Sequence, residues 1–184
     1  EINCTFSRNQ QRKMIFYCLI LPVNFTIINA TTNHLTTIRN LNEAALPAVS
    51  SVTLDDLEHF LRISDYFRIL KFEDNITGFL IAMIPGKPYN SMNYKWFEKE
   101  YKSFMYVDRI VIAPQFHGNG FGRTFYDDLS DYSIDKTSRI TCEVNIRPMN
   151  EGSIIFHKKY GFNEVGTQKT EDGNKEVSLM AFDL

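Results

Sequence analysis

Residues 111–123 read VIAPQFHGNGFGR, and this stretch decides the fold. The β-branched residues before Pro114 are typical of a strand end, and Gly118, Gly120 and Gly122 follow in a loop. Glycine accepts positive φ and lets a ligand approach the backbone closely. A helix that begins directly after the glycines presents unpaired N–H groups at the positive end of its dipole. The stretch therefore predicts a strand, a turn and a helix start that together bind a phosphate or pyrophosphate.

Two familiar phosphate-binding loops do not fit these residues. A P-loop requires Gly-Lys-Ser/Thr after its glycines, whereas Gly122 is followed by Arg123 and Thr124. The third glycine also comes one residue too early for a dinucleotide-binding fingerprint. An ordinary strand-to-helix turn stays open as an alternative, because glycines cluster in such turns too.

A second block, residues 150–162, reads NEGSIIFHKKYGF. Together with the Gln/Arg-x-x-Gly-x-Gly/Ala pattern filled by Gln115, Gly118 and Gly120, it resembles the two signature motifs of the GNAT superfamily of acyl-CoA-dependent N-acyltransferases. The resemblance covers roughly the stretch 24–184 and also extends to a subgroup of predicted acetyltransferases whose acceptor it does not identify. Two motifs in the right order are more specific than either alone.

The resemblance implies an α+β fold with a central mixed, mostly antiparallel sheet of about seven strands and helices on both faces. It also implies that the strand at 104–113 splays from the strand at 139–146. Residue patterns independently predict the same architecture. The expected strands are 24–30, 66–72, 76–84, 104–113, 139–146, 162–168 and 176–182, and the expected helices are 31–46, one from Thr53, 120–136 and 151–160.

Residues 85–102, PGKPYNSMNYKWFEKEYK, predict a loop followed by a short amphipathic helix. Its aromatic rings either cover the sheet or form a lid over an acceptor site, since insertions on a rigid scaffold commonly supply specificity. In the second case Tyr89, Asn93, Tyr94 and Trp96 are the predicted substrate-binding residues.

Residues 1–23 are expected to be an N-terminal extension, or an extra strand, that precedes an acetyltransferase domain at 24–184. Basic residues before a short apolar run also resemble a targeting signal. However, no small-residue cleavage site follows the run, and the run is too short to span a bilayer.

The chain has 184 residues, 43% of them hydrophobic, which suits one domain with a good core. Its net charge of −2 gives no electrostatic case for nucleic acid. Three scattered cysteines suggest neither a disulfide framework nor a zinc site, so a cytoplasmic protein is expected. The four histidines lack the spacing of metal ligands, and we expect no metal. No membrane partner is expected either.

By resemblance, acetyl-CoA or CoA is the expected cofactor. The loop amides from residue 115 to 123 would bind its pyrophosphate, and the strand before them would pair with its pantetheine arm. The predicted cofactor-binding residues are Ile110, Val111, Ile112, Gln115, Phe116, His117, Gly118, Asn119, Gly120, Phe121, Gly122, Arg123, Asn150, Ser153, Phe156 and His157.

Acetyl transfer to an amine also needs a proton donor for the departing thiolate. The superfamily often uses a tyrosine directly after the phenylalanine of its second block, where this sequence has His157. Histidine donates a proton near neutral pH, so His157 is one candidate and Tyr160, one turn later, is another. Alternatively, His157 simply packs beside Phe156 or caps the pantetheine arm.

An amine must lose a proton before it attacks, because its pKa of about 10.4 keeps it protonated at neutral pH. Glu143 and Asp108 lie in apolar strands and are the candidate bases. Burial of these carboxylates also fits a structural role, in which Arg109 forms an ion pair with Glu143.

These residues predict an acetyl-CoA-dependent N-acetyltransferase. Direct attack in a ternary complex would move the acetyl group to a primary amine of a small molecule, protein or peptide. Two alternatives are a CoA-binding module without turnover and a general α/β nucleotide-binding domain. A monomer or a homodimer fits, the latter through the edge that the C-terminal strand is expected to offer.

Overall fold

The computed structural model describes residues 25–170 and 173–184, and the predicted extension 1–23 lies outside them. Within this part, one seven-stranded sheet has the order β1-β2-β3-β4-β5-β7-β6. Its strands are β1 Phe25–Asn29, β2 Tyr66–Phe72, β3 Asn75–Met83, β4 Met105–Ile112, β5 Arg139–Arg147, β6 Asn163–Thr170 and β7 Lys175–Asp183. The helices are α2 Leu35–Ala44, α3 Leu54–Ile63, α4 Met92–Glu100, α5 Phe121–Ser133 and α6 Glu151–Tyr160, with 3-10 turns η2 Thr32–His34 and η3 Pro114–Phe116.

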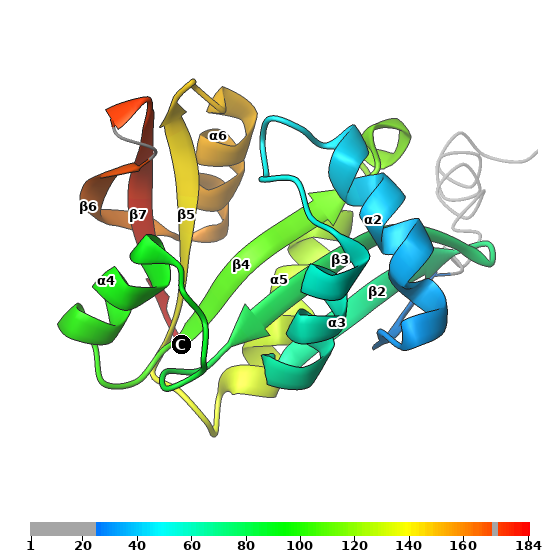
Figure 1. Ribbon diagram of the computed structural model, residues 1–184, viewed down its shortest axis with the longest axis horizontal. Coiled ribbons are helices and arrows are strands. Elements are labelled where there is room, and N and C mark those ends of the chain that lie inside the picture. Colours follow the sequence, from blue (N-terminus) through cyan, green and yellow to red (C-terminus); the bar gives the residue numbers. More distant parts are fainter. Residues whose placement is uncertain (1–24, 171–172) are drawn as a thin grey trace, which may run out of the picture.

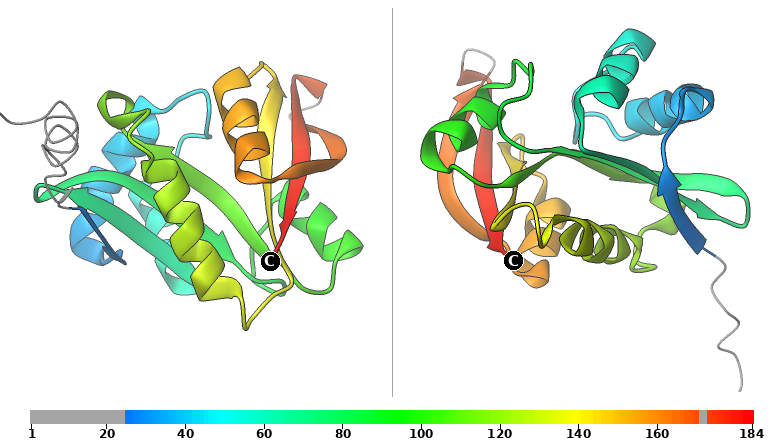
Figure 2. Two further views of the ribbon diagram at one scale, coloured as in Figure 1. Left: turned by 180° about the vertical axis from the view of Figure 1, so that it is seen from behind. Right: turned by 90° about the horizontal axis from the view of Figure 1, so that it is seen from below.

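This architecture confirms the predicted α+β fold. The β4–β5 pair is parallel, and the other five pairs of the described sheet are antiparallel. Figure 2 shows α2, α3 and α4 on one face and α5 and α6 on the other. Each layer buries an apolar cluster against the sheet, because the strands alternate their side chains between the two faces.

The sheet opens into a V between β4 and β5 (Figure 1). The two strands pair over only three positions, the last of which joins Val107 to Cys142. Beyond that point the neighbouring residues Asp108 and Glu143 begin the two arms of the V, which confirms the splay implied by the family resemblance. The edge of β4 that faces the opening therefore carries no pairing with β5 after Val107.

A β-bulge lies in β4 at the start of the opening. Ala82 of β3 pairs with Val107, and Ile81 pairs with Arg109, so Asp108 is an extra residue. Strict alternation would turn Arg109 toward α5, but its guanidinium instead lies over the ring of Phe60 on α3. The bulge thus places two consecutive charged side chains on the same side of the sheet.

One expectation about the sheet edge is wrong. The C-terminal strand β7 lies between β5 and β6, so β6 is the edge strand at this end of the described sheet and β1 is the edge strand at the other. Because β6 pairs along most of β7, it covers the edge that a dimer was expected to share. None of the helices in the described part of the chain is long and apolar enough to cross a membrane.

Candidate active site

Two cavities meet at the opening between β4 and β5. The glycine groove, about 800 Å³, is lined by β4, the glycine turn, α5 and α6. The acidic cavity, about 370 Å³, contains Asp108 and Glu143. Both cavities lie within the size range of ligand sites. The residues that border both are Ala48, Val49, Ile110, Asn150, Ser153 and His157.

The glycine turn has the geometry of an anion site. Gly118 and Gly120 have φ values of 81° and 82°, a region that side chains rarely adopt, and nothing lies within 4 Å of where their Cβ atoms would be. Gly120 is the N-cap of α5, and Thr124 makes the first N–H bond within that helix, to the Gly120 carbonyl at 3.0 Å. The preceding N–H groups of the first turn are free for an anion, because a helix leaves them without internal partners.

Most of the predicted cofactor-binding residues border this groove. They are Ile110, Val111, Ile112, Phe116, His117, Gly118, Gly120, Phe121, Gly122, Arg123, Asn150, Ser153, Phe156 and His157. Gln115 and Asn119 do not border it. Gly122 also has a packing role, because a Cβ there would lie 3.0 Å from the ring of Phe156 on α6.

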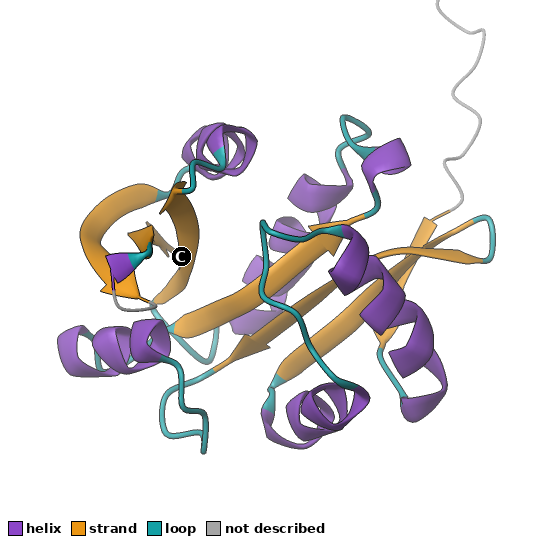
Figure 3. Cartoon of the chain, turned by 45° about the horizontal axis from the view of Figure 1, so that its top comes forward, coloured by secondary structure: helices purple, strands orange, loops and turns teal. Residues whose placement is uncertain are grey.

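Sequence reasoning missed the opposite wall of the groove. It consists of Ala44 and Ala45 at the end of α2 and of Ala48 and Val49 in the α2–α3 loop. These small apolar residues form no recognisable sequence motif, so only their position in the folded structure identifies them as part of the groove. Figure 3 shows this loop crossing over β4 toward the opening.

Side chains from both arms of the V hold the α2–α3 loop. Arg109 donates from Nη1 to Asn42 Oδ1 at 2.9 Å and to the Ser50 carbonyl at 3.3 Å. Asn42 Nδ2 donates to the same carbonyl at 2.9 Å. From β5, Asn145 Nδ2 lies 3.4 Å from the Pro47 carbonyl. The loop is therefore fixed above the junction of the two cavities.

Asp108 is a fully engaged carboxylate in the acidic cavity. Its side chain is 4% exposed, Arg109 Nε donates to Oδ2 at 2.6 Å, and the Tyr89 hydroxyl donates to Oδ1. Because both oxygens have partners and a guanidinium lies beside the carboxylate, these contacts favour a structural role for Asp108 over that of the general base.

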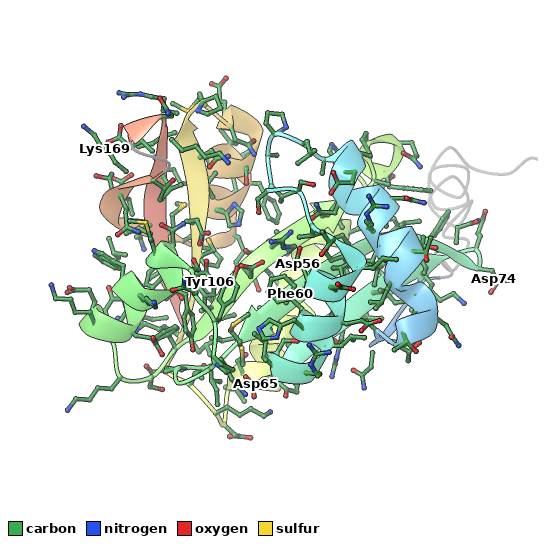
Figure 4. The ribbon with its side chains drawn as sticks, in the orientation of Figure 1. Asp56, Phe60, Asp65, Asp74, Tyr106 and Lys169 are labelled. Carbon is green, nitrogen blue, oxygen red and sulfur yellow. The ribbon has the colours of Figure 1, made fainter. Side chains whose placement is uncertain are left out.

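Glu143 is the second carboxyl group of the acidic cavity, and one of its oxygens lacks a hydrogen bond within the described part of the chain. Oε1 accepts from the Tyr106 hydroxyl at 2.9 Å, and the buried Oε2 has no hydrogen-bond partner among the described residues. Figure 4 marks Tyr106, which pairs with Thr141 at the base of the V. Burial and then the charge of Asp108 raise the pKa of Glu143 to about 8.

The predicted ion pair between Arg109 and Glu143 is wrong. The bulge turns Arg109 toward its chain neighbour Asp108, with which it forms the short ion pair described above. Arg109 acts on Glu143 only through its charge, which offsets part of the increase in the Glu143 pKa.

His157 lies at the junction, and both of its ring nitrogens have hydrogen-bond partners. Its ring is 3% exposed, Nδ1 donates to the Ser153 carbonyl at 2.7 Å, and Nε2 accepts from the Tyr126 hydroxyl at 2.8 Å. Burial lowers the pKa of His157 to about 4, so the imidazole is neutral at pH 7. These contacts favour the packing alternative over the expected role as acid.

Tyr160 is also directed away from the junction. Its hydroxyl donates to Asp127 Oδ1 at 3.0 Å and lies 3.2 Å from Ser130 Oγ, both on α5. Burial raises its pKa above the ordinary value. These contacts with α5 favour a structural role for Tyr160 over the expected role as a proton donor.

The predicted acceptor residues divide into two groups. Tyr89 and Asn93 line the acidic cavity. Tyr94 is fully buried and donates to the Ile84 carbonyl at 2.8 Å, while the indole of Trp96 packs against Gly166 of β6. Helix α4 thus covers the sheet at Tyr94 and Trp96, which fits the first of the two alternatives for this segment and leaves Tyr89 and Asn93 as the candidate substrate-binding residues.

The described residues contain no group of three or more histidine, cysteine or acidic side chains that holds a metal. Cys142, a buried free thiol on β5, borders the acidic cavity.

Comparisons with known proteins agree with this geometry. An uncharacterized N-acetyltransferase of Methanocaldococcus jannaschii is 26% identical over 138 residues, which are 63% of this chain and 60% of that relative. The aligned region therefore spans less than two thirds of the relative's length.

Solved structures share the fold at low sequence identity. Ard1 from Thermoplasma volcanium has a TM-score of 0.73 at 15% identity, covering 88% of this chain and 99% of its own. The ribosomal-protein-S18-alanine N-acetyltransferase from Escherichia coli has a TM-score of 0.64 at 17% identity, covering 86% of this chain and 93% of its own. Arabidopsis thaliana Naa50, in complex with the bisubstrate analogue CoA-Ac-MVNAL, has a TM-score of 0.68 at 14% identity, covering 88% of this chain and 100% of its own.

The model of the acetyltransferase (GNAT) family matches residues 35–162, which include α2, the bulged strand, the glycine turn and α6. With the V-shaped opening and the turn at the start of α5, this match shows that the chain belongs to the GNAT acetyltransferase family.

Proposed function

We propose that the chain is an acetyl-CoA-dependent N-acetyltransferase that transfers the acetyl group directly to a primary amine while both substrates are bound. The observation that supports this most is the meeting of two cavities at the opening between β4 and β5. One has the features of a CoA site and the other holds an available carboxyl group. Their junction lets a thioester and an amine come together without a covalent enzyme intermediate.

The glycine groove suits CoA in two respects. The first turn of α5 offers N–H groups to the pyrophosphate, and the positive-φ glycines leave room for close approach. The edge of β4 beyond Val107 has no partner on β5, so an extended pantetheine arm can add to it like a short strand. The acetyl group would then lie at the junction, beside Ile110 and Asn150.

The acidic cavity suits the amine. An acceptor arrives as an ammonium ion at neutral pH and must lose a proton before attack. Glu143 borders the cavity, and its buried Oε2 has no hydrogen-bond partner among the described residues. Its pKa of about 8 lies near neutral pH, where a general base is most effective. We assign Glu143 as the base and Asp108 as the fixed charge beside it.

The acceptor is proposed as a primary amine of a small molecule or of a peptide end. Tyr89, Ser91, Asn93 and Asn145 give the cavity hydroxyl and amide groups that can orient such a ligand. The Naa50 structure is a complex with the bisubstrate analogue CoA-Ac-MVNAL, which makes short peptides a sensible first class to test.

The test combines binding and turnover. Isothermal titration should show CoA binding more tightly than ADP, because the pantetheine arm contributes contacts. A thiol-release assay with acetyl-CoA and a panel of amines and short peptides should show free CoA that depends on the amine. Binding of CoA without release across the panel would leave a binding module and overturn the enzymatic proposal.

A further inference from the structure

We propose that Glu143 carries the proton through the whole reaction, taking it from the amine and returning it to the thiolate of CoA. This inference rests on the proposed function and adds the identity of the proton donor, which neither histidine nor tyrosine of the second motif supplies. It follows from the position of Glu143 and from the contacts of the tyrosine, histidine and cysteine side chains around it.

Glu143 lies where the amine would lose its proton and where the thiolate of CoA would gain one. It is the first residue of β5 after the paired stretch, directly beyond Cys142, and it borders the acidic cavity. The thioester must lie where this cavity joins the glycine groove, since the acetyl group comes from one side and the amine from the other. Because Glu143 borders this cavity beside Val107 and Ile110, the proposed complex brings its carboxyl group near both the attacking nitrogen and the departing sulfur.

The tyrosine protons near the junction are directed to other acceptors. The Tyr126 hydroxyl donates to His157, and the Tyr89 hydroxyl donates to Asp108. The Tyr106 hydroxyl donates to Glu143 itself. Donating to a thiolate would break these bonds inside a buried region, where an unpaired acceptor is costly.

Cys142 does not fill the role either. Burial and then the charge of Glu143 raise the pKa of its thiol well above the ordinary value. A thiol made weaker as an acid by its surroundings does not protonate another thiolate. Of the two carboxyl groups of the acidic cavity, Glu143 is the one that holds a proton at pH 7 and can release it, because its pKa is about 8 while Asp108 is paired with Arg109.

Several charged or titratable groups face Glu143 and set its proton affinity. The charge of Asp108 raises the pKa of Glu143, whereas hydrogen bonds from Asn93 and Tyr106 and the charge of Arg109 lower this pKa. The titratable and charged groups around it are Asp108, Arg109 and Tyr106 on β4, Tyr89 before α4, Tyr126 on α5, Cys142 on β5, and His157 on α6 and Lys175 on β7, which border the same cavity. Burial outweighs the attractive contributions, so Glu143 rests as the neutral acid at pH 7.

Glu143 is protonated before the substrates bind and again after the products form, so the protons are balanced over one catalytic cycle. Entry of an ammonium ion displaces the Glu143 proton to solvent, and the carboxylate then takes a proton from the ammonium. The neutral amine attacks the carbonyl carbon, forming the C–N bond. As the C–S bond breaks, Glu143 gives its proton to the sulfur and takes one from the new amide nitrogen. The net products are the amide, CoA thiol and one proton.

A pair of amines of similar size separates this shuttle from a base alone. Ethylamine needs deprotonation, whereas methoxyamine is already unprotonated at neutral pH. The shuttle predicts that Glu143→Gln slows CoA release by roughly 100-fold with both amines, in line with general acid–base contributions. Recovery of the wild-type rate by E143Q with methoxyamine would leave Glu143 as a base only and overturn the inference, while the proposed function would stand.

A measurement that needs no turnover tests the same inference. Difference infrared spectroscopy of the CoA-bound protein should show a protonated carboxyl band that titrates near pH 8 and is absent in E143Q. An ionised Glu143 at pH 6 would refute the shuttle. By contrast, absence of CoA release by the wild-type protein across the amine panel refutes the proposed function, so the two failures are distinguishable.

Discussion

The Glu143→Gln variant gives a stability prediction that does not depend on knowing the acceptor. Raising the pKa of Glu143 from 4.5 to about 8 means that the folded protein binds a proton more tightly than the unfolded chain. The stabilisation of the protonated form is complete below pH 4.5 and is lost as pH rises through 8. A tenfold change in a protonation equilibrium is worth about 1.4 kcal/mol, so the loss approaches about 5 kcal/mol.

Glutamine keeps the shape of the side chain but cannot ionise. E143Q should therefore match the wild-type free energy of unfolding near pH 5 and exceed it by several kcal/mol near pH 9. Urea denaturation of both proteins at pH 5, 7 and 9 measures this difference. Glu58→Gln, at an exposed position of α3, controls for the loss of one carboxylate. A difference between E143Q and wild type that does not change with pH would refute the burial argument.

Four further outcomes follow. Gly120→Val should abolish CoA binding in a titration, whereas Gly86→Ala, also at a positive φ and outside both cavities, should keep it. Gly122→Ala should cost about 1–3 kcal/mol in urea denaturation, because its Cβ would lie 3.0 Å from an α6 ring. His157, with a pKa lowered from 6.5 to about 4, should make the protein lose about 3 kcal/mol of stability as pH falls through this window, and His157→Gln should remove that loss. Arg109→Met should destabilise the fold by about 3–5 kcal/mol, since it leaves a buried carboxylate unpaired, and Arg109→Lys should restore part of this in the same assay.

The fold was predictable because local signals and long-range motifs agreed. Thr53 and Asp56 form the capping box at the start of α3, where the sequence places a helix. The turn at Gly118 and Gly120 was also predictable, since its conformation needs glycine at those positions. Such features are encoded within a few residues.

The site was only partly predictable, because its chemistry depends on contacts between distant segments. One extra residue in β4 redirects Arg109 from Glu143 to Asp108, and sequence periodicity does not reveal a bulge. His157 fits the motif position for an acid, yet its neighbours Tyr126 and Ser153 occupy both ring nitrogens. These partners come from α5 and from the preceding turn of α6.

The sequence could not separate the two alternatives for residues 85–102 for a related reason. Aromatic residues over 85–102 suggested a lid, but an amphipathic helix gives the same pattern when it packs on a sheet. Tyr94 is buried in the core, and the indole of Trp96 packs against the small residue Gly166 on the distant strand β6. Tyr89, in the loop before the helix, remained at the cavity.

The most direct test of the central claim counts both products of one reaction. Wild-type protein, acetyl-CoA and the most active amine of the panel are incubated, and free CoA and acetylated amine are quantified by thiol assay and mass spectrometry. Transfer at the junction of the two cavities predicts equal amounts of both products and a large loss of both in E143Q. Free CoA without acetylated amine, or turnover that is unchanged in E143Q, would contradict the account.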